Sequence, residues 1–347
     1  MTRPPATPAQ TSHRARHRWF PIIVVAGVAL LVLPAIHHPP PFAPAPIPVT
    51  LKLNWQPGVQ FLGFFVAAER GEYLAEGLAV RIDSAVDPVS GLSIPQRVAA
   101  AEFDFAVGGF ELMLAQAEGV AVTMIASLYQ HGPDVFFARR SSGIRTPRDL
   151  AGRRIVMKNP VWRDRVLAPL LARVGLSLDD VVLVPGGFDM TPFYEGEVEV
   201  WAGYISNEVV RARLHGLEVV TLPVQDYVQY PSANNIYTRA ALLGQQPELA
   251  VAFLRASLRG WQWALEHPEA AVDLLLARFP ALATERDFHL ASFDSSIPLI
   301  RSPGQPVGAV DCTRWLDHSL LAGTAAPAAL CDAGVYTAAT ADGALRP

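Results

Sequence analysis

Cysteine is scarce in this sequence of 347 residues, which contains only Cys312 and Cys331. Two cysteines so far apart match no recognisable spacing of a zinc or iron–sulfur site, so the sequence implies no metal and no cofactor. In an exported chain the two cysteines could pair with each other, and the alternative is two free buried thiols. The sequence leaves both alternatives open.

Charge is also sparse, because only 17% of the residues are charged while 51% are hydrophobic. The formal net charge is -4, and no aromatic and basic residues interleave along a face, so there is no electrostatic case for nucleic acid as a partner. The length and the apolar content suit two packed lobes better than one domain.

Common catalytic signatures are absent too, including the P-loop, the G-x-S-x-G elbow, H-E-x-x-H and C-x-x-C. The nine histidines are scattered along the chain. Asp179 and Asp180, like the acids between Asp83 and Asp87, are better interpreted as turn and cap residues than as catalytic carboxylate pairs. The residues themselves therefore indicate no catalytic centre.

The amino-terminal region carries the clearest compartment signal. Residues 1–18 contain four arginines and no acid, and residues 19–36, WFPIIVVAGVALLVLPAI, carry no charge. At about 1.5 Å per helical residue this run would span roughly 27 Å, close to the hydrocarbon core of a bilayer. We expect a signal peptide or a signal anchor at 19–36, with 1–18 cytoplasmic and the remainder outside. Because proline crowds the expected cleavage region, we favour an uncleaved anchor, followed by a proline-rich stalk at 37–48.

Strand and helix patterns alternate from residue 49 onward. Apolar and polar residues alternate in the segment VTLKLN, which predicts a strand that ends at Trp55, before the break Gln56-Pro57-Gly58. Alternation of strands and helices predicts a mostly parallel sheet with helices on both faces. Further strands of this first lobe are expected at 79–83, 104–109, 122–129 and 134–139.

A second, smaller α/β unit follows Gly143. Its first helix is expected to have Thr146 as its cap and Pro147 at its first position. Its strands are expected at 153–158, 179–186, 198–204 and 217–224. The simplest topology has the chain leave the first lobe near residue 138 and return near residue 235, with a cleft between the lobes. This gives lobe 1 at 49–138 and 235–301, lobe 2 at 139–234, and a C-terminal extension at 302–347.

Candidate binding residues of the first lobe follow its strands, because ligands of open α/β sheets collect beyond the carboxyl ends of the strands. Trp55 could stack on a planar ring, and a tryptophan packed in the core is the alternative. His131 could lie at the hinge or in an ordinary surface turn. The candidates are Asn54, Trp55, Gln56, Phe110, Glu111 and His131.

Candidates of the second lobe also follow strands. Asn159 and Trp162 come after the strand RRIVMK, and Tyr204, Asn207 and Glu208 come after VEVWAGY. A carboxylate at Glu208 could accept a hydrogen bond from an amino or ring N–H group. Helix capping alone would account for Asn207, and a first helical turn also suits Glu208.

Several segments resemble the periplasmic solute-binding proteins of ABC transporters that are similar to the yeast thiamine-pyrimidine synthase. The resemblance covers about residues 49–280 and is carried by LNWQPGVQFLGFFVAAERGEYLAEGLAV, DFAVGGFELMLAQAEGVAVTMIASL, SGIRTPRDLAGRRI, VEVWAGYISNEVV and PELAVAFLRASLRGWQWALEHPEAAVDLL. It implies a two-lobed periplasmic-binding-protein fold of type II, on the periplasmic side of the inner membrane. An ABC permease in that membrane is the implied partner.

The same resemblance implies a small ligand in the cleft, such as a pyrimidine precursor of thiamine, while relatives take riboflavin, sulfonates or nitrate. Trp55 would stack on the ligand ring, and Tyr204 and Glu208 would contact it from the other lobe. Two positions depart from the pattern of pyrimidine binders, which often have asparagine at Gly58 and histidine at Phe61.

The enzyme branch of this family is an alternative of a different class. It would make hydroxymethylpyrimidine phosphate from pyridoxal phosphate, held by a lysine, and a histidine, with iron bound by a cysteine-rich motif. In this sequence the corresponding segments read AVGGFELML and DYVQYPSANNIY, without lysine, histidine or cysteine. A Schiff base needs an amine, which Gly109 does not have. We therefore expect a binding protein and not an enzyme; a membrane-tethered sensory receptor would use the same cleft.

Overall fold

The computed structural model describes residues 45–84, 92–157, 160–228, 233–317 and 329–341, together with residues 321 and 343. The expected signal or anchor segment at 19–36 and most of the stalk lie outside the described residues. Within the described part of the chain, no helix has both the length and the apolar character needed to cross a bilayer.

A five-stranded mixed sheet in the order β2-β1-β3-β10-β4 forms the first lobe. β1 pairs in parallel with β2 and β3, whereas β10 pairs antiparallel with β3 and β4. The strands are β1 (Ile47–Lys52), β2 (Leu78–Asp83), β3 (Phe105–Gly108), β4 (Val122–Ser127) and β10 (Asn235–Arg239). Because Ile47 and Pro48 pair with Leu78 and Ala79, they belong to β1 and not to the expected stalk.

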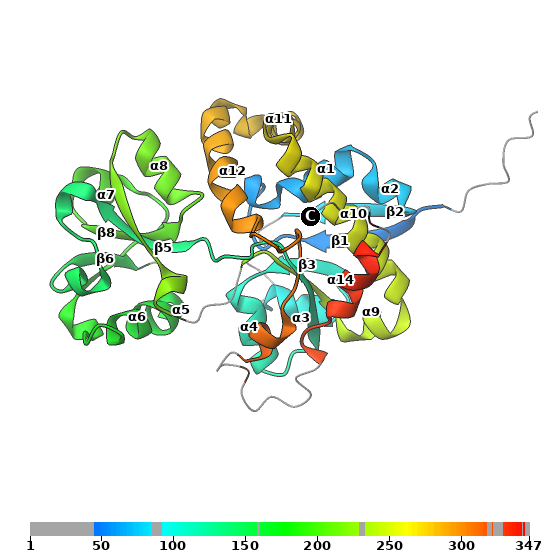
Figure 1. Ribbon diagram of the computed structural model, residues 1–347, viewed down its shortest axis with the longest axis horizontal. Coiled ribbons are helices and arrows are strands. Elements are labelled where there is room, and N and C mark those ends of the chain that lie inside the picture. The colour runs from blue at the N-terminus through cyan, green and yellow to red at the C-terminus, as the bar shows by residue number, and fades with distance from the viewer. Residues whose placement is uncertain are drawn as a thin grey trace, which may run out of the picture. The chain divides into compact units, whose positions relative to one another are not determined.

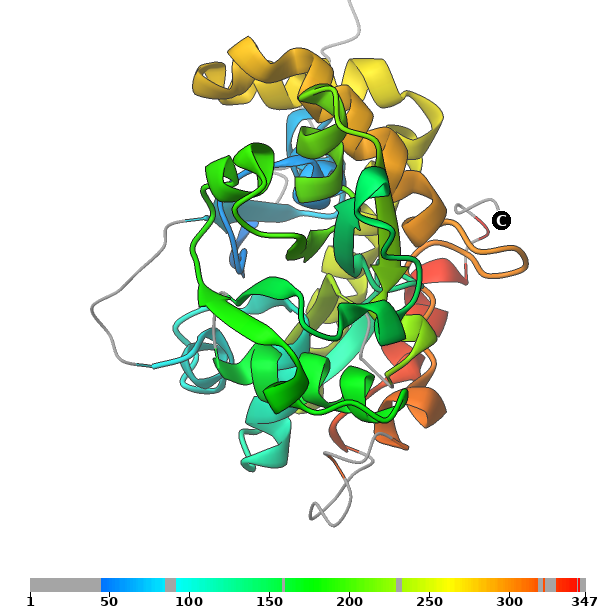
Figure 2. The same cartoon turned by 90° about the vertical axis from the view of Figure 1, so that its left-hand side faces the viewer.

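The second lobe contains another five-stranded mixed sheet, in the order β7-β6-β8-β5-β9. This lobe is drawn in green in Figures 1 and 2. β6 pairs in parallel with β7 and β8, and β5 pairs antiparallel with β8 and β9. The strands are β5 (Asp134–Arg139), β6 (Arg154–Met157), β7 (Val182–Pro185), β8 (Val200–Tyr204) and β9 (Val219–Pro223). Two α/β lobes with mostly parallel strands confirm the fold class expected from the alternating patterns.

The crossing between the lobes differs from the expected one. The strand DVFFAR, which we expected to end lobe 1 at residue 138, is β5 and hydrogen-bonds only to second-lobe strands among the described residues. The chain therefore changes lobes between Ser127 and Asp134. Periodicity did not reveal this, because a fully buried strand has the same apolar pattern in either sheet. The return at β10 lies where the sequence placed it.

Helices cover both faces of each sheet (Figure 1). The short helix that begins after Thr146 has Thr146 as its N-cap and Pro147 in its first turn, as expected, and Thr146 also forms a capping box with Asp149. The α-helices are α1 (Leu62–Glu69), α2 (Glu72–Ala75), α3 (Ile94–Ala99), α4 (Phe110–Ala117), α5 (Pro160–Trp162), α6 (Ala168–Ala172), α7 (Thr191–Glu195), α8 (Glu208–Leu214), α9 (Ala240–Gln245), α10 (Pro247–Glu266), α11 (Pro268–Arg278), α12 (Arg286–Ile300), α13 (Cys312–Leu316) and α14 (Ala333–Thr340). A π-helical turn, η4 (Arg163–Leu167), joins α5 to α6, and short 3₁₀ turns are η1 (Val59–Phe61), η2 (Arg140–Ser142), η3 (Pro147–Leu150), η5 (Leu178–Asp180), η6 (Val224–Asp226) and η7 (Pro280–Glu285).

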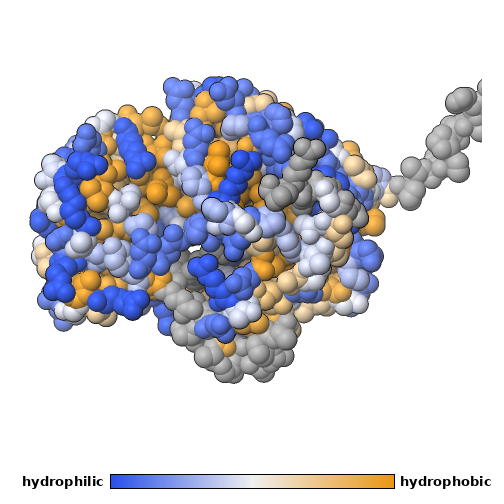
Figure 3. Space-filling model, in the orientation of Figure 1, coloured by the Kyte–Doolittle hydropathy of each residue, from blue (hydrophilic) through white to orange (hydrophobic). Residues whose placement is uncertain are grey.

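Side chains of the first sheet alternate between two apolar cores. Phe105 and Val107 pack in the core with α1 and α10, while Ala106 packs in the core with α3 and α4. This is the period of two that a strand buried on both faces requires. The molecular surface seen in Figure 3 mixes charged and polar residues with apolar ones, as solvent-facing surfaces normally do.

Helices α1 and α10 pack closely because glycines face each other. A Cβ atom at Gly260 would meet the carbonyl oxygen of Gly63 and the methyl group of Ala67, and one at Gly63 would meet the ring of Trp261. The buried Trp261 therefore lies over a backbone that has no side chain at that point. Glycine has a low helix propensity, so it destabilises the two helices locally. The close packing that it allows explains why it is present at these positions.

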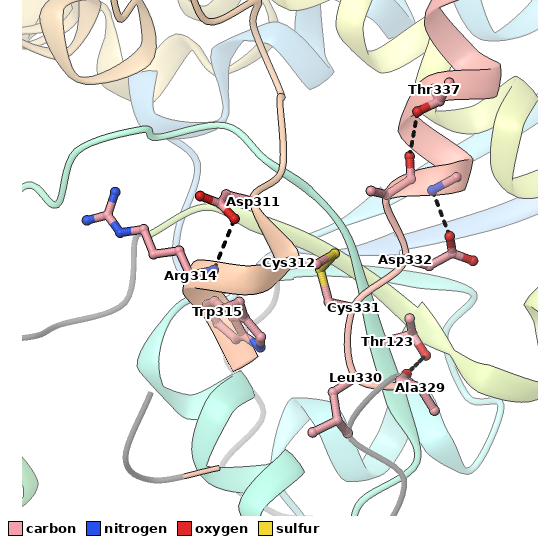
Figure 4. Close-up of a disulfide and its surroundings, with 12 residues drawn as sticks. Thr123, Asp311, Cys312, Arg314, Trp315, Ala329, Leu330, Cys331, Asp332 and Thr337 are labelled. Carbon is pink, nitrogen blue, oxygen red and sulfur yellow. Dashed lines mark hydrogen bonds between the residues drawn. A yellow bond between two sulfur atoms is a disulfide. The ribbon is translucent and has the colours of Figure 1, made fainter. Parts of the chain in front are cut away.

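The C-terminal segment packs on the first lobe and contains a disulfide between Cys312 and Cys331 (Figure 4). Of the two alternatives left open by the sequence, the paired one is present. Gln116 of α4 donates from Nε2 to the carbonyl of Leu330 and accepts at Oε1 from the indole N–H of Trp315. The described part of the extension 302–347 therefore holds α4 and β4 from outside.

We predict that substituting Gly260→Ala lowers the free energy of unfolding by about 1–3 kcal/mol, because the added methyl group overpacks the contact between α1 and α10. Gly244→Ala is the matched control, since a Cβ at Gly244 in α9 has open space around it. That control should be neutral or up to about 1 kcal/mol more stable. Urea unfolding of both variants measures the difference, and equal effects would contradict the packing described here.

Loss of the disulfide should also destabilise the protein. Its cysteines are separated by 19 residues, and a loop of this size predicts about 3 kcal/mol of stabilisation from restricting the unfolded chain. The double variant Cys312→Ser/Cys331→Ser should show a lower midpoint of thermal unfolding. Reductant should lower the midpoint of the parent chain and leave that of the double variant unchanged. A response of the double variant to reductant would assign the effect to something else.

Candidate functional site

A cavity of about 470 Å³ is lined by residues of both lobes. The first lobe contributes the segment after β1, the start of α4 and the residues before β10; the second contributes the starts of β5, α5 and α8, the end of β8 and a loop before α7. Its described lining residues are Asn54, Trp55, Gln60, Gly109, Phe110, Glu111, Leu114, Asp134, Val161, Trp162, Phe188, Ala202, Gly203, Tyr204, Asn207, Glu208, Ala233 and Asn234.

Asn54 and Glu111 form the polar part of the first-lobe wall. The Nδ2 group of Asn54 donates to Oε1 of Glu111 at 2.8 Å. Gly108 makes room for this acid, because a Cβ there would approach Oε1 of Glu111 to 3.1 Å. The glycines of the DFAVGG segment therefore permit close approach of a side chain that faces the cavity.

Trp55 lies at the mouth of the cavity with 42% of its surface exposed. Its ring centroid is 5.1 Å from that of Phe188, which comes from the second lobe and is also exposed. The tryptophan is therefore not part of the core, which was the alternative to a surface that could stack on a ring. Two aromatic rings from different lobes meet beside the opening.

Glu208 is the buried acid of the second-lobe wall. Its Oε2 atom accepts a hydrogen bond of 2.8 Å from the backbone N–H of Tyr204. The carboxyl group folds back over Gly203, where a Cβ would come within 2.6 Å of it. Any larger residue at the end of β8 would displace the acid from this position.

Asn207 is the N-cap residue of α8, yet its side chain makes no capping hydrogen bond. Its Oδ1 atom accepts from Nε of Arg211 at 3.3 Å. Arg211 in turn pairs with Glu285 of η7. Helix capping therefore does not account for the orientation of the Asn207 side chain, which lines the cavity.

Asp134, the first residue of β5, is a third acid in the cavity and was not among the sequence candidates. It is 3% exposed. Burial raises the pKa of Asp134 to about 8, and the carboxylates of Glu208 and, to a smaller extent, Glu111 act in the same direction. At neutral pH this carboxyl group is therefore largely in its protonated form.

Eight of the sequence candidates line the cavity: Asn54, Trp55, Phe110, Glu111, Trp162, Tyr204, Asn207 and Glu208. Gln56 and His131 are not among its lining residues. The backbone N–H of His131 bonds to the carbonyl of Leu299, and its ring lies 3.4 Å from the hydroxyl of Ser302. Asn159 lies outside the described residues.

Sequence reasoning missed several lining residues. Asp134 could have been noticed as a lone acid that begins an otherwise apolar strand. Asn234 lies just before the returning strand β10. Its positive φ marks an unusual backbone conformation, which the structure shows and the sequence did not. Gln60, Val161 and Phe188 have no sequence signal that separates them from ordinary surface residues.

The described lining residues offer nothing that would hold pyridoxal phosphate as a Schiff base, because none of them is a lysine. In the described part of the chain, no group of three histidine, cysteine, aspartate or glutamate side chains is placed to bind a metal ion. What the cavity does offer is aromatic surface together with carboxylate acceptors.

Comparisons with known proteins agree with the resemblance seen in the sequence. The family model described as "NMT1/THI5 like" matches residues 59–271. The chain is 32% identical over 286 residues to the riboflavin-binding protein RibY of Chloroflexus aurantiacus, covering 75% of this chain and 78% of that one. It is 23% identical to a formylaminopyrimidine-binding protein of Halalkalibacterium halodurans, covering 77% of this chain and 82% of the relative.

An enzyme is also among the relatives: a 4-amino-5-hydroxymethyl-2-methylpyrimidine phosphate synthase of Legionella pneumophila is 28% identical, covering 68% of this chain and 75% of that one. Among solved structures, the periplasmic sulfonate-binding protein SsuA of Methylobacillus flagellatus superimposes with a TM-score of 0.64 at 16% identity, covering 86% and 95% of the two chains. This likeness confirms the two-lobed binding-protein fold.

The enzyme branch is not favoured. The relative at 32% identity is a binding protein, and the positions where an enzyme would need a lysine and a histidine hold Gly109 and its neighbours. These comparisons support the non-enzymatic prediction. Since the family model covers more than half of the 347 residues, the chain belongs to the NMT1/THI5-like family.

Proposed function

We propose that this chain is the substrate-binding protein of an ABC importer and that it binds a small nitrogen heterocycle in the cavity between its lobes. A pyrimidine precursor of thiamine is the ligand type that the sequence suggested, and riboflavin belongs to the same broad class. Support comes from the family, from the names of the relatives and from the two-lobed fold. The observation that carries the proposal is that Trp55 and Glu208, from different lobes, line one cavity.

The two walls suit a planar heterocycle. Trp55 offers an exposed indole face at the opening, and aromatic rings stack favourably on planar rings. Glu111 and Glu208 provide carboxylate oxygens that can accept hydrogen bonds from ring N–H and amino groups. Asn54, the residue before Trp55 in the sequence, donates from its side-chain amide to Glu111.

Electrostatics argues against an anionic ligand such as a sulfonate or nitrate. Three acids, Glu111, Asp134 and Glu208, line the cavity, while its described lining residues include no lysine, arginine or histidine. At about 4 Å, two like charges near a protein surface repel by about 4 kcal/mol at an effective dielectric constant of about 20. The likeness to sulfonate-binding SsuA therefore concerns the fold and not the ligand.

Closure of the lobes would present the bound form to a permease. A ligand that contacts both walls favours the conformation in which they are close, by its difference in affinity for the two conformations. The permease would be in the inner membrane and the binding protein on its periplasmic side, exported through or anchored by residues 19–36. The same cleft on a membrane-tethered chain could serve a sensory receptor, and the identity of the membrane partner distinguishes the two.

We predict that the purified full chain is stabilised by a nitrogen heterocycle. Ligand at about 100 times its Kd should add about 2.7 kcal/mol to the free energy of unfolding. Thermal unfolding with formylaminopyrimidine, riboflavin, methanesulfonate and nitrate, each added separately, measures this. Stabilisation by methanesulfonate or nitrate alone would remove the heterocycle assignment.

Substitution of the aromatic wall should reduce affinity without unfolding the protein. Trp55→Ala should weaken binding of the stabilising heterocycle about tenfold, since an aromatic pair contributes about 0.5–1.5 kcal/mol beyond the area it buries. Trp55→Phe should retain most of the affinity. Isothermal titration measures both, and an unchanged Kd for Trp55→Ala would show that the ligand does not stack there.

The acid of the second wall should matter through its charge. Glu208→Gln keeps an oxygen that can accept from the backbone N–H of Tyr204, yet it should weaken binding by about 10-fold or more, because hydrogen bonds to charged groups contribute about 1.5–3 kcal/mol. Glu195→Gln, an exposed glutamate at the end of α7 outside the cavity, is the matched control and should bind normally. Equal affinities of the two variants would argue against a role of Glu208.

A further inference from the structure

Arg211 of α8 joins the two lobes outside the cavity. Its Nη1 and Nη2 atoms donate to the two carboxylate oxygens of Glu285, in η7 of the first lobe, at 2.8 and 3.3 Å. The central carbon of its guanidinium group also lies 3.8 Å from the centroid of the Phe288 ring, in α12. A bidentate pair that stacks on an aromatic ring uses the planar shape of arginine, which lysine does not have.

The same guanidinium group reaches a residue of the cavity wall. Nε of Arg211 donates to Oδ1 of Asn207 at 3.3 Å, and Asn207 lines the cavity. Since arginine has donors only, this bond fixes which end of the amide carries Oδ1, and Nδ2 with its two N–H groups is the other end. Arg211 therefore orients a side chain of the binding site while its other nitrogens hold the first lobe.

Helix α12 connects this contact to the point where the chain crosses between the lobes. It packs in the core of the first lobe, and in Figure 1 it lies on the side of that lobe that faces α8. Near its carboxyl end, the carbonyl of Leu299 accepts from the backbone N–H groups of Gln130 and His131, which lie in the crossing segment. At about 1.5 Å per helical residue, Phe288 lies roughly 16 Å along the helix from Leu299.

Contacts at this distance from the crossing depend on the angle between the lobes. A rotation of about 10° around an axis through the crossing and across α12 would move a point about 16 Å away by roughly 3 Å, which is enough to break a hydrogen bond. The buried bond from Oγ of Ser292 to the carbonyl of Ser206 lies closer to the crossing and would move less. The Arg211 contacts therefore depend on the arrangement in which both lobes line one cavity.

We propose that Arg211 is a positioning residue of the binding site, which fastens the lobes in the ligand-binding arrangement and orients the amide of Asn207 toward a hydrogen-bond acceptor of the ligand. This inference rests on the proposed function, because it concerns affinity for the molecule bound in the same cavity. It assigns part of that affinity to residues outside the cavity, since Arg211, Glu285 and Phe288 are not among its described lining residues.

A conformational equilibrium explains how a contact outside the cavity affects binding. A ligand that binds only when the lobes are close has an apparent Kd equal to its intrinsic Kd divided by the fraction of the protein in that arrangement. Removing contacts that exist only there lowers this fraction. Affinity should therefore fall even when no atom in contact with the ligand has changed.

The expected effect is moderate, because the ion pair is partly exposed. The side chains of Arg211 and Glu285 are 39% and 46% exposed, and exposed ion pairs are weak in water. Stacking of the guanidinium group on Phe288 adds a comparable contribution. Together these contacts predict that loss of the guanidinium group raises Kd by about 5- to 10-fold.

Lobe separation in the absence of ligand tests the fastening directly. Nitroxide labels on Glu118→Cys in the first lobe and Asp179→Cys in the second, both exposed positions, give a distance distribution by double electron–electron resonance of the full chain. Arg211→Met should broaden this distribution and shift its maximum. Arg213→Met is the matched control, because Arg213 is an exposed arginine of the same helix, and it should leave the distribution unchanged.

Binding measurements separate positioning from simple stabilisation. Isothermal titration with riboflavin, and separately with formylaminopyrimidine, should give a Kd about 5- to 10-fold higher for Arg211→Met and an unchanged Kd for Arg213→Met. Glu285→Gln should weaken binding in the parent chain and have no further effect in Arg211→Met, because paired residues are not additive. A role in stability alone would lower the midpoint of thermal unfolding and leave every Kd unchanged.

Orientation of the cavity amide has its own test. Asn207→Ala should weaken binding of the same two heterocycles in the parent chain by about 5- to 10-fold, because a neutral hydrogen bond to the ligand is lost. In Arg211→Met the same substitution should have a smaller effect, since the amide is no longer held. Equal effects in the two backgrounds would show that Arg211 does not orient Asn207.

Several outcomes would overturn the inference. They are the same lobe separation in Arg211→Met and Arg213→Met, an unchanged Kd in Arg211→Met, and additive effects of Arg211→Met and Glu285→Gln. The proposed function fails separately, when neither heterocycle binds the parent chain. In that case the measurement of lobe separation, which needs no ligand, still decides whether Arg211 fastens the lobes.

Discussion

The antiparallel placement of β5 and β10 determines what the cavity contains. These are the strands on which the chain enters the second sheet and returns to the first, and each lies beside parallel strands of its own sheet. An antiparallel strand brings its amino end to the edge where its neighbours end. Asp134 is therefore opposite Tyr204, the last residue of β8, and Asn235 is opposite Gly108, the last residue of β3.

The same constraint explains how much of the site the sequence could predict. The rule that ligands meet the carboxyl ends of strands led to Trp55, Glu111 and Glu208, which all line the cavity. It could not lead to Asp134 or Asn234, because their position depends on strand direction, and apolar periodicity carries no information on direction. Periodicity predicted the two α/β units and the resemblance implied the type II binding-protein fold, whereas neither placed the crossing point correctly.

His131 shows the limit of the rule from the other side. His131 follows β4, so the rule predicted that it would lie at the cavity. However, β4 is the edge strand of its sheet. There the C-terminal segment pairs with it, through bridges from Met124 to Cys331 and from Ser127 to Gly308. The His131 ring lies near Ser302 of that segment. The C-terminal segment, which is remote in sequence, therefore lies beside the end of β4, where the rule would have placed a ligand.

Contacts outside the cavity hold its acids in position. Gln116 of α4 is fixed by Leu330 and Trp315 of the C-terminal segment, and Glu111 lies in the first turn of that helix. On the other wall, the buried Ser292 of α12 donates to the carbonyl of Ser206, two residues before Glu208. The extension whose role the sequence left open thus supports one acid, and the helix before it supports the other.

This support has an energetic consequence for the three acids. Acids held rigidly near one another in a cavity cannot move apart to reduce their repulsion, so one of them takes up a proton instead. Asp134 is the most buried of the three, and burial is the largest cause of its raised pKa. The fixed position of these acids therefore favours the protonated form of Asp134, together with its burial.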